Sequence, residues 1–195
     1  IGKVQCTVRR GNAAEAIIEL AAAEKQTLIA MTTHGRSGLD RWLLGSVAEK
    51  VLRGASNPTL VVRAKKEKNP AWEMATLKRV IVPLDGSELS ERILPHVEVL
   101  AKHLDLEVTL LGVYGGPLPA GASEGFHSMD AFVVSLRNET EIYLAAKTEE
   151  MKQRGLNKVS FAAKQGLEAD EIIATARETL DTLIAMCTHG RNGVQ

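Results

Sequence analysis

The sequence has no net charge, few cysteines and no long apolar run, and each of these features excludes a class of protein. Its 195 residues contain 24 Lys and Arg against 24 Asp and Glu, so the basic surface of a dedicated nucleic-acid-binding protein is not expected. No uninterrupted apolar run approaches the roughly 18–20 residues that span a bilayer, and charge gives no attraction to a membrane. We therefore expect a soluble, cytoplasmic protein.

Residues that carry chemistry are also sparse. The two cysteines, Cys6 and Cys187, lie in apolar, strand-like stretches and are most simply interpreted as small buried thiols in a reducing compartment. His34 and His189 stand beside glycines, without an Asp or Glu at the spacing of a triad or a metal site. No general base, nucleophile or metal-binding carboxylate cluster stands out, so the sequence does not predict an enzyme of rapid turnover.

A duplicated segment organises the chain. The stretch TLIAMTTHGRSG at Thr27–Gly38 matches TLIAMCTHGRNG at Thr182–Gly193 at a constant offset of 155 residues, with Thr32 against Cys187 as one of only two differences. Each copy runs from an apolar strand into a loop that contains glycine, and in the first copy residues 45–46 then open a new helical pattern. This order presents backbone N–H groups to a phosphate.

The hydrophobic pattern predicts alternating strands and helices. The expected strands are Val4–Val8, Leu28–Met31, Thr59–Val62, Val80–Leu84, Leu106–Tyr114 and Val159–Ala163. The expected helices cover residues 14–21, 46–54, 89–104 and 129–151, and Ser46 with Glu49 has the spacing of a capping box. Such alternation predicts a parallel, doubly wound sheet, whose ligands bind at the carboxyl ends of the strands near the switch in strand order.

At this point the residues resemble the universal stress protein family. The stretch MTTHGRSGLDRWLLGSVAEKVLR with NPTLVVR is similar to the fourth strand, phosphate loop, fourth helix and fifth strand of that family, and KRVIVPLDGSELSERILP is similar to its first strand and helix. The resemblance implies an α/β fold of the adenine nucleotide alpha hydrolase-like kind, with a doubly wound parallel five-stranded sheet in the order 3-2-1-4-5. It also implies binding of ATP or a related adenine nucleotide, with Mg²⁺ as accompanying ion, in a regulatory or stress-survival role with at most slow ATP hydrolysis.

The resemblance also assigns roles to individual residues. ATP-binding members carry a loop of the form Gly-x2-Gly-x9-Gly-Ser/Thr, whose second glycine falls here on Gly35 and whose first falls on Thr32. Asp85 would contact the adenosine end, and Val113 would contact the base through its backbone. The full predicted nucleotide-binding set is Thr32, Gly35, Arg36, Gly45, Ser46, Pro83, Asp85, Val113 and Gly190.

Other interpretations of the same residues stay open. A side chain at Thr32 or Cys187 would crowd the phosphates, because glycine permits the closest backbone approach. The alternative function is therefore a nucleotide-free dimerisation or interaction module of the same fold. Asp85 could serve only in a turn before a helix, and Arg36 could simply be a solvated loop residue. An adenylate-transferring enzyme would need a catalytic loop that we do not find in the sequence.

The offset between the copies also predicts the domain organisation. We expect residues 1–65 to be the C-terminal part of a first universal stress protein domain, 66–76 a linker, and 77–195 a second domain without its last helix and strand. The chain would then belong to a longer tandem, paired through the last strand as a homodimer or an intramolecular pseudo-dimer. The alternative is exchange of segments, which pairing between Val80–Leu84 and Leu28–Met31 would support.

Overall fold

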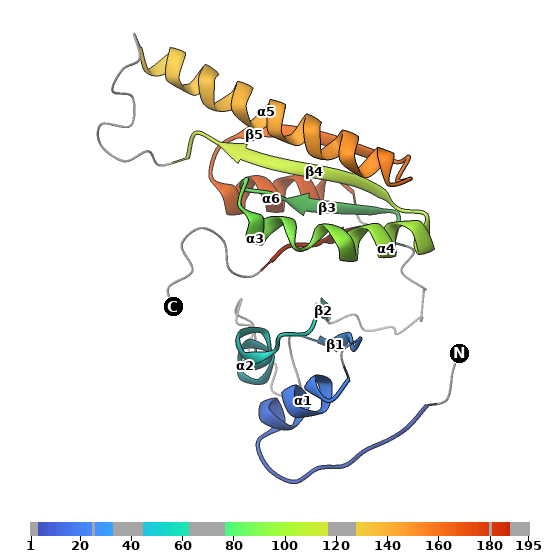
Figure 1. Cartoon of the computed structure of the whole chain (residues 1–195). Coiled ribbons are helices and arrows are strands. Elements are labelled where there is room, and N and C mark those ends of the chain that lie inside the picture. Colours follow the sequence, from blue (N-terminus) through green and yellow to red (C-terminus); the bar gives the residue numbers. More distant parts are fainter. Residues whose placement is uncertain are drawn as a thin grey trace. The chain divides into compact units, whose positions relative to one another are not determined.

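The computed structural model describes residues 4–24, 26–32, 45–62, 77–116, 128–179 and 181–187. The chain divides into two compact units, Ile1–Trp72 and Glu73–Gln195 (Figure 1). The division falls within the predicted linker 66–76, whose residues lie outside the described ones. Each unit is treated by itself below.

The first unit is built on a parallel strand pair. Its elements are α1 (Ala13–Ala22), β1 (Ile29–Thr32), α2 (Ser46–Gly54) and β2 (Thr59–Val62). β1 and β2 run parallel with Ile29 opposite Thr59, and Ile29, Val51, Ala14 and Ala21 form a small buried core. The helical and strand-like stretches of residues 14–21 and 59–62 were predicted where the structure places them.

The prediction of a strand at Val4–Val8 is wrong. Residues 4–10 have no strand structure, and Val4 and Val8 are 79% and 96% exposed. A strand needs a neighbour for its backbone groups, and the two strands described in this unit pair with one another. The interpretation of Cys6 as a buried thiol is wrong for the same reason, because Cys6 is exposed.

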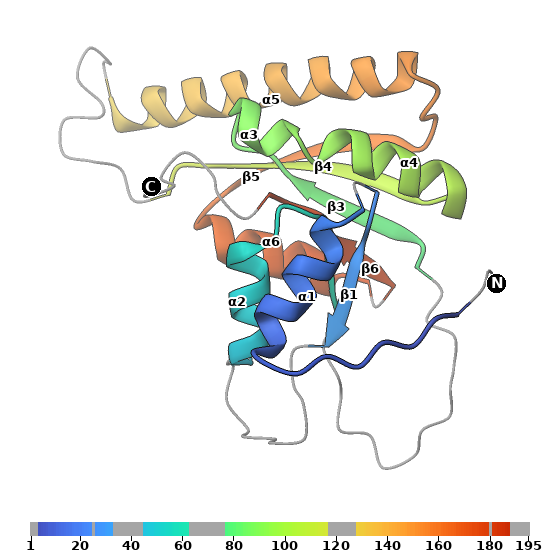
Figure 2. The same cartoon turned by 60° about the horizontal axis from the view of Figure 1, so that its bottom comes forward.

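The second unit contains a four-stranded parallel sheet. Its elements are β3 (Arg79–Pro83), α3 (Glu88–Glu91), α4 (Leu94–Leu104), β4 (Glu107–Tyr114), α5 (Met129–Gln153), β5 (Val159–Gln165), α6 (Glu168–Arg177) and β6 (Thr182–Ile184). The strands lie in the order β5-β4-β3-β6, with α3, α4 and α5 on one face and α6 on the other (Figures 1 and 2). Two helical layers around a parallel sheet confirm the predicted α/β class.

The core of this unit lies at β3 and β4, which are buried on both faces. Val82 and Leu110 are fully buried and belong to one cluster with residues of α4 and α5. Gly112 lets α5 approach the sheet closely, because a Cβ at this position would lie 2.5 Å from Thr140 Cγ2 and 2.9 Å from Leu144 Cδ1. The middle of α5 is therefore seated directly on β4.

The helix predicted at residues 89–104 is two helices in the structure. α3 ends at Glu91 and α4 begins at Leu94, with Pro95 in its first turn. Proline has no N–H and clashes with the preceding turn of a helix, so the ladder cannot run unbroken past Glu91. The chain changes direction at Arg92 and Ile93, beside the carboxyl end of the sheet.

The predicted strand order 3-2-1-4-5 is found in two parts. The second unit has the first four positions as β5-β4-β3-β6, and the first unit has a fourth and fifth position as β1-β2. Both edges of β3 are filled, by β4 and by β6, so the pairing with β1 that segment exchange requires is not formed. The pairing that would have supported exchange within one chain is thus not found among the described residues, and exchange between chains and tandem organisation stay predictions.

Candidate functional site

The switch in strand order of the second unit lies between β3 and β6. From β3 the chain builds the sheet outward through β4 and then β5, and it returns to the other side of β3 with β6. Connections that leave two neighbouring strands in opposite directions open a crevice at their carboxyl ends, which is where doubly wound sheets bind ligands. Asp85 follows β3 at this edge and Cys187 follows β6.

A tight turn displays Asp85 at this crevice. Its Oδ1 accepts hydrogen bonds from the Ser87 backbone N–H at 2.9 Å and from Ser87 Oγ at 2.6 Å. Gly86 has φ of +79°, which an L side chain adopts only with strain, and Ser87 caps α3 by accepting from Ser90 N–H at 3.1 Å. Asp85 therefore holds the turn and also leaves an exposed carboxylate at the end of β3.

The backbone of Val113 is turned towards the same crevice. Leu111 accepts a hydrogen bond from Leu84 N–H at 2.9 Å, so its backbone faces β3. In a parallel strand alternate residues direct their backbone groups to the same side, and Val113 therefore also faces the β3 side. The ladder with β3 ends at Leu111, so Val113 lies beyond it, next to the turn that Asp85 occupies. Pro83, the last residue of β3, is half-buried in that ladder.

Cys187 lies against the junction between α3 and α4. It is half-buried, and burial raises the pKa of its thiol, whereas the Ile93 backbone and the charge of Arg92 act in the opposite direction. The side chain thus occupies the place where β6 leaves the sheet. A half-buried thiol whose pKa is raised is a packing group and a poor nucleophile.

The described residues of the first copy flank the predicted phosphate loop on both sides. Thr32 is the last residue of β1, and Gly45 is the N-cap of α2 with Ser46 as first helical residue. The capping-box interpretation of Ser46 is wrong: Gly45 O accepts from Glu49 N–H at 3.0 Å, and Glu49 pairs with Arg53 at 3.1 Å. Ser46 is thus the first residue of α2 and takes no part in a reciprocal cap.

Comparison with known proteins fits this arrangement of strands and turns. The sequence model of the universal stress protein family matches residues 1–63 and 76–195. The chain belongs to the universal stress protein family.

Several family members are similar to this chain over part of their length. Two curated universal stress proteins from Methanocaldococcus jannaschii are 45% identical over 65 residues and 38% identical over 63 residues, which is 33% and 32% of this chain and 38% and 39% of those proteins. A crystal structure of a universal stress protein from Archaeoglobus fulgidus aligns with a TM-score of 0.58 at 23% identity, over 85% of this chain and 51% of that one. This chain therefore spans about two fifths of the curated relatives and half of the solved one.

The predicted site residues of this family member fall into both units. Pro83, Asp85 and Val113 come together in the second unit as described above, whereas Thr32, Gly45 and Ser46 belong to the first. Gly35, Arg36 and Gly190 lie outside the described residues. Within the described ranges no group of three or more His, Cys, Asp or Glu side chains could hold a metal ion, and no helix there is long and apolar enough to cross a membrane.

A cluster between α3 and α5 was missed from the sequence. Tyr143 Oη donates to Glu91 Oε1 at 2.9 Å, and Lys147 Nζ lies 2.7 Å from Glu91 Oε2. Burial raises the pKa of the Tyr143 hydroxyl, and Glu91 and Asp85 raise it further. Glu91 is more than 50 residues from its partners in sequence, so no local pattern could have indicated the contact.

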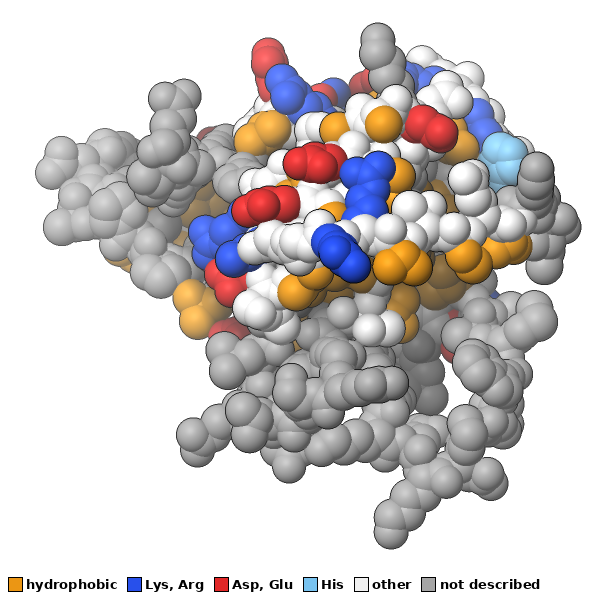
Figure 3. Space-filling view, turned by 90° about the horizontal axis from the view of Figure 1, so that it is seen from below, with side chains coloured by type: hydrophobic (Ala, Val, Ile, Leu, Met, Phe, Trp, Pro, Cys, Tyr) orange, Lys and Arg blue, Asp and Glu red, His pale blue; other side chains and the backbone are white. Residues whose placement is uncertain are grey.

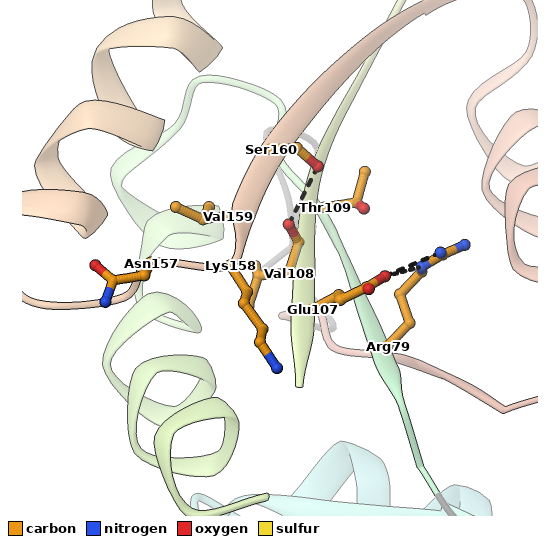
Figure 4. Close-up of a pocket in the computed structure, with 8 residues that line it drawn as sticks. All are labelled: Arg79, Glu107, Val108, Thr109, Asn157, Lys158, Val159 and Ser160. Carbon is orange, nitrogen blue, oxygen red and sulfur yellow. Dashed lines mark hydrogen bonds and ion pairs between the residues drawn. The ribbon is translucent and has the colours of Figure 1, made fainter. Parts of the chain in front are cut away.

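A shallow pocket lies at the opposite edge of the sheet. It has a volume of about 380 Å³ and is lined at the amino ends of β3, β4 and β5 by residues that include Arg79, Glu107 and Lys158 (Figure 4). Arg79 and Glu107 form an ion pair at 3.0 Å across it. Because parallel α/β sheets bind ligands at the carboxyl ends of their strands, this pocket is not the candidate site.

Proposed function

We propose that this universal stress protein family member binds ATP or a related adenine nucleotide in a regulatory or stress-survival role. The observation that carries the proposal is the exposed Asp85 carboxylate at the switch point, with the backbone of Val113 turned towards it. Family membership supports the adenine nucleotide as the ligand class. No nucleic acid or membrane partner is part of the proposal, since acidic and basic side chains are interspersed on the face seen in Figure 3.

The chemistry of these two groups suits a nucleoside. A carboxylate accepts hydrogen bonds from vicinal ribose hydroxyls, and such charge-assisted bonds are about twice as strong as neutral ones. A backbone N–H and C=O on the same side of a strand offer one donor and one acceptor to the edge of a base. Asp85 and Val113 would thus hold the two ends of adenosine.

In each copy the phosphates of a nucleotide bound there would lie on that copy's own glycine loop. By family resemblance Gly35, Arg36, Gly45 and Ser46 would contact them in the first copy and Gly190 in the second. The first N–H groups of α2 have no intrahelical acceptor, which favours an anion at that end. Mg²⁺ would arrive with the nucleotide, and the chemistry that it supplies is neutralisation of phosphate charge.

A nucleotide-free interaction module is the second candidate. The observation that favours it is the half-buried Cys187 side chain at the first loop position, where ATP-binding members have glycine. Thr32 gives the first copy a side chain at the same place. Pairing through the last strand, in a homodimer or a pseudo-dimer, would then be the main activity.

Calorimetry with ATP separates the two candidates. The test compares the full chain with Asp85→Asn, and uses Asp105→Asn as a matched control, because Asp105 lies at the opposite edge, paired with Lys158 at 2.7 Å. Loss of a charge-assisted bond costs about 1.5–3 kcal/mol, so Asp85→Asn should weaken ATP binding by about tenfold or more. The control should bind like the unmodified chain.

Two results would contradict the proposal. Absence of binding by the unmodified chain at millimolar ATP would favour the interaction module. Equal loss in both variants would show that the charge change, and not the position of Asp85, weakens binding. Heat release of bound nucleotide from the purified protein, followed by chromatography, identifies which adenine nucleotide it carries.

A further inference from the structure

The Asp85 turn is connected to α5 by a continuous set of contacts through α3. Asp85 holds Ser87, Ser87 Oγ accepts from Ser90 N–H at 3.1 Å, and Ser90 Oγ donates back to Ser87 O at 2.8 Å. Glu91, the last residue of α3, then accepts hydrogen bonds from Tyr143 and Lys147 of α5, one on each carboxylate oxygen. Ser87, Ser90 and Glu91 therefore connect the turn to α5.

α3 needs such support because it is too short to be stable alone. It spans four residues, Glu88–Glu91, and isolated helices below about 12 residues are marginal in water. Its cap at Ser87 fixes one end, and the Glu91 contacts fix the other. The Glu91 contacts add to the backbone bonds by which Arg92 and Ile93 N–H groups close this end on Leu89 O and Ser90 O.

The Glu91 contacts are more protected than an ordinary surface ion pair. The side chains of Lys147 and Glu91 are 22% and 27% exposed, and Tyr143 packs partly buried against the core. Exposed pairs are worth little because water screens them and the side chains lose entropy. Here the tyrosine ring is already held by packing, so its hydroxyl lies in place for Glu91 at little further entropic cost.

α5 is itself fixed to the strand that carries Val113. Thr140 and Leu144 pack on Gly112 at a distance that leaves no room for a Cβ, and Tyr143 lies between those two residues in sequence. Tyr143 thus connects Asp85 at the end of β3 to the part of β4 that contains Val113. The β3–β4 ladder sets the spacing between the two groups assigned to adenosine as far as Leu84 and Leu111, and this connection supports the turn beyond the ladder.

We propose that Tyr143 and Lys147 are positioning residues, which hold α3 through Glu91 and so fix the Asp85 turn against Val113 for the nucleoside. The role rests on the proposed nucleotide function. It requires no contact between Tyr143 or Lys147 and the ligand. In the protein without ligand, the turn is already ordered by α5.

Amide hydrogen exchange and ATP titration of the full chain test the proposal together. The variants are Tyr143→Phe, which keeps the ring, and Lys147→Met. The matched control is Arg137→Met, which removes an exposed ion pair with Glu141 on the same helix. We expect Tyr143→Phe to speed exchange of the Ser87 and Ser90 amides by about tenfold and to weaken ATP binding by about fivefold to tenfold.

Two further variants separate positioning from general stability. Lys147→Arg keeps a cation for Glu91, so its Ser87 and Ser90 exchange and its ATP affinity should match those of the unmodified chain. If Lys147 served only in packing, Lys147→Arg and Lys147→Met would give the same exchange rates and the same ATP affinity. In the Asp85→Asn background, Tyr143→Phe should weaken ATP binding no further, because the two residues act through one turn. The free energy of global unfolding should fall by no more than about 1 kcal/mol, the contribution of one hydrogen bond, and Arg137→Met should behave like the unmodified chain.

The outcomes separate this proposal from the proposed function. Unchanged Ser87 and Ser90 exchange in Tyr143→Phe overturns the positioning role, whether or not ATP binds. Faster exchange with unchanged ATP affinity also overturns it and leaves the nucleotide function standing. If the unmodified chain binds no ATP, the proposed function fails, and the exchange data alone then decide whether α5 orders the turn.

Discussion

Replacing Gly112 with alanine tests how closely α5 is seated on β4. The added Cβ would lie 2.5 Å from Thr140 Cγ2 and 2.9 Å from Leu144 Cδ1, both below any normal carbon–carbon contact. Leu144 is fully buried and Thr140 is held by its hydrogen bond to Leu136 O, so neither side chain turns away freely. Overpacking of this kind costs about 1–3 kcal/mol, and the gain from removing a strand glycine offsets about 0.5–1 kcal/mol of it. A net loss with a central value of about 1 kcal/mol, and at most about 2.5 kcal/mol, follows.

Urea unfolding followed by circular dichroism measures this loss, with exchange of β4 amides to assign it to the second unit. The double variant Gly112→Ala with Thr140→Ser is the sharper test, because serine lacks the clashing methyl but keeps the hydroxyl that donates to Leu136 O at 2.8 Å. We expect it to recover about half of the loss. A Gly112→Ala protein as stable as the unmodified chain would refute the close seating of α5, and with it the connection of Tyr143 to Val113.

Two further predictions concern a buried hydroxyl and the two thiols. Thr148 Oγ1 is buried without a hydrogen-bond partner among the described residues, so Thr148→Val should leave stability unchanged or raise it by about 1 kcal/mol in the same urea assay; a loss above that amount would show that the hydroxyl has a partner. The exposed Cys6 should react with a maleimide well before Cys187. Because burial raises the pKa of Cys187, its thiolate fraction is lowered, and its labelling should accelerate only as the pH rises; labelling at equal rates near neutral pH would contradict its placement.

The strands and helices were predictable wherever local pattern and tertiary contact agree. Thr59–Val62 is a β-branched run after Asn57-Pro58 and has the same bounds in sequence and structure. Val4–Val8 has an equally good pattern, but pattern alone supplies no neighbouring strand. Pro95 broke a helix whose apolar spacing continued across it, since periodicity reports which face is buried and not whether each N–H can donate.

The candidate site was predictable in part. Asp85 could be placed at a carboxyl end because it directly follows an apolar strand, and the direction of the Val113 backbone followed only once the register with β3 was known. The Tyr143 contact could not be predicted, because it joins α5 to a helix more than 50 residues earlier. Nucleotide binding itself stays a prediction.

The pentapeptide TLIAM occurs at residues 27–31 and 182–186, and its two copies pair with different neighbouring strands. In β1 the N–H of Ile29 donates to Pro58 O, towards β2, whereas in the second copy the N–H of Ala185 donates to Ile81 O, towards β3. Consecutive positions of the same peptide thus bond at its two opposite edges, and Ile29 is 8% exposed whereas the equivalent Ile184 is 38% exposed. This is what the fourth position of the predicted order 3-2-1-4-5 requires, because a strand at that position lies between two parallel neighbours and must offer hydrogen-bonding groups to both.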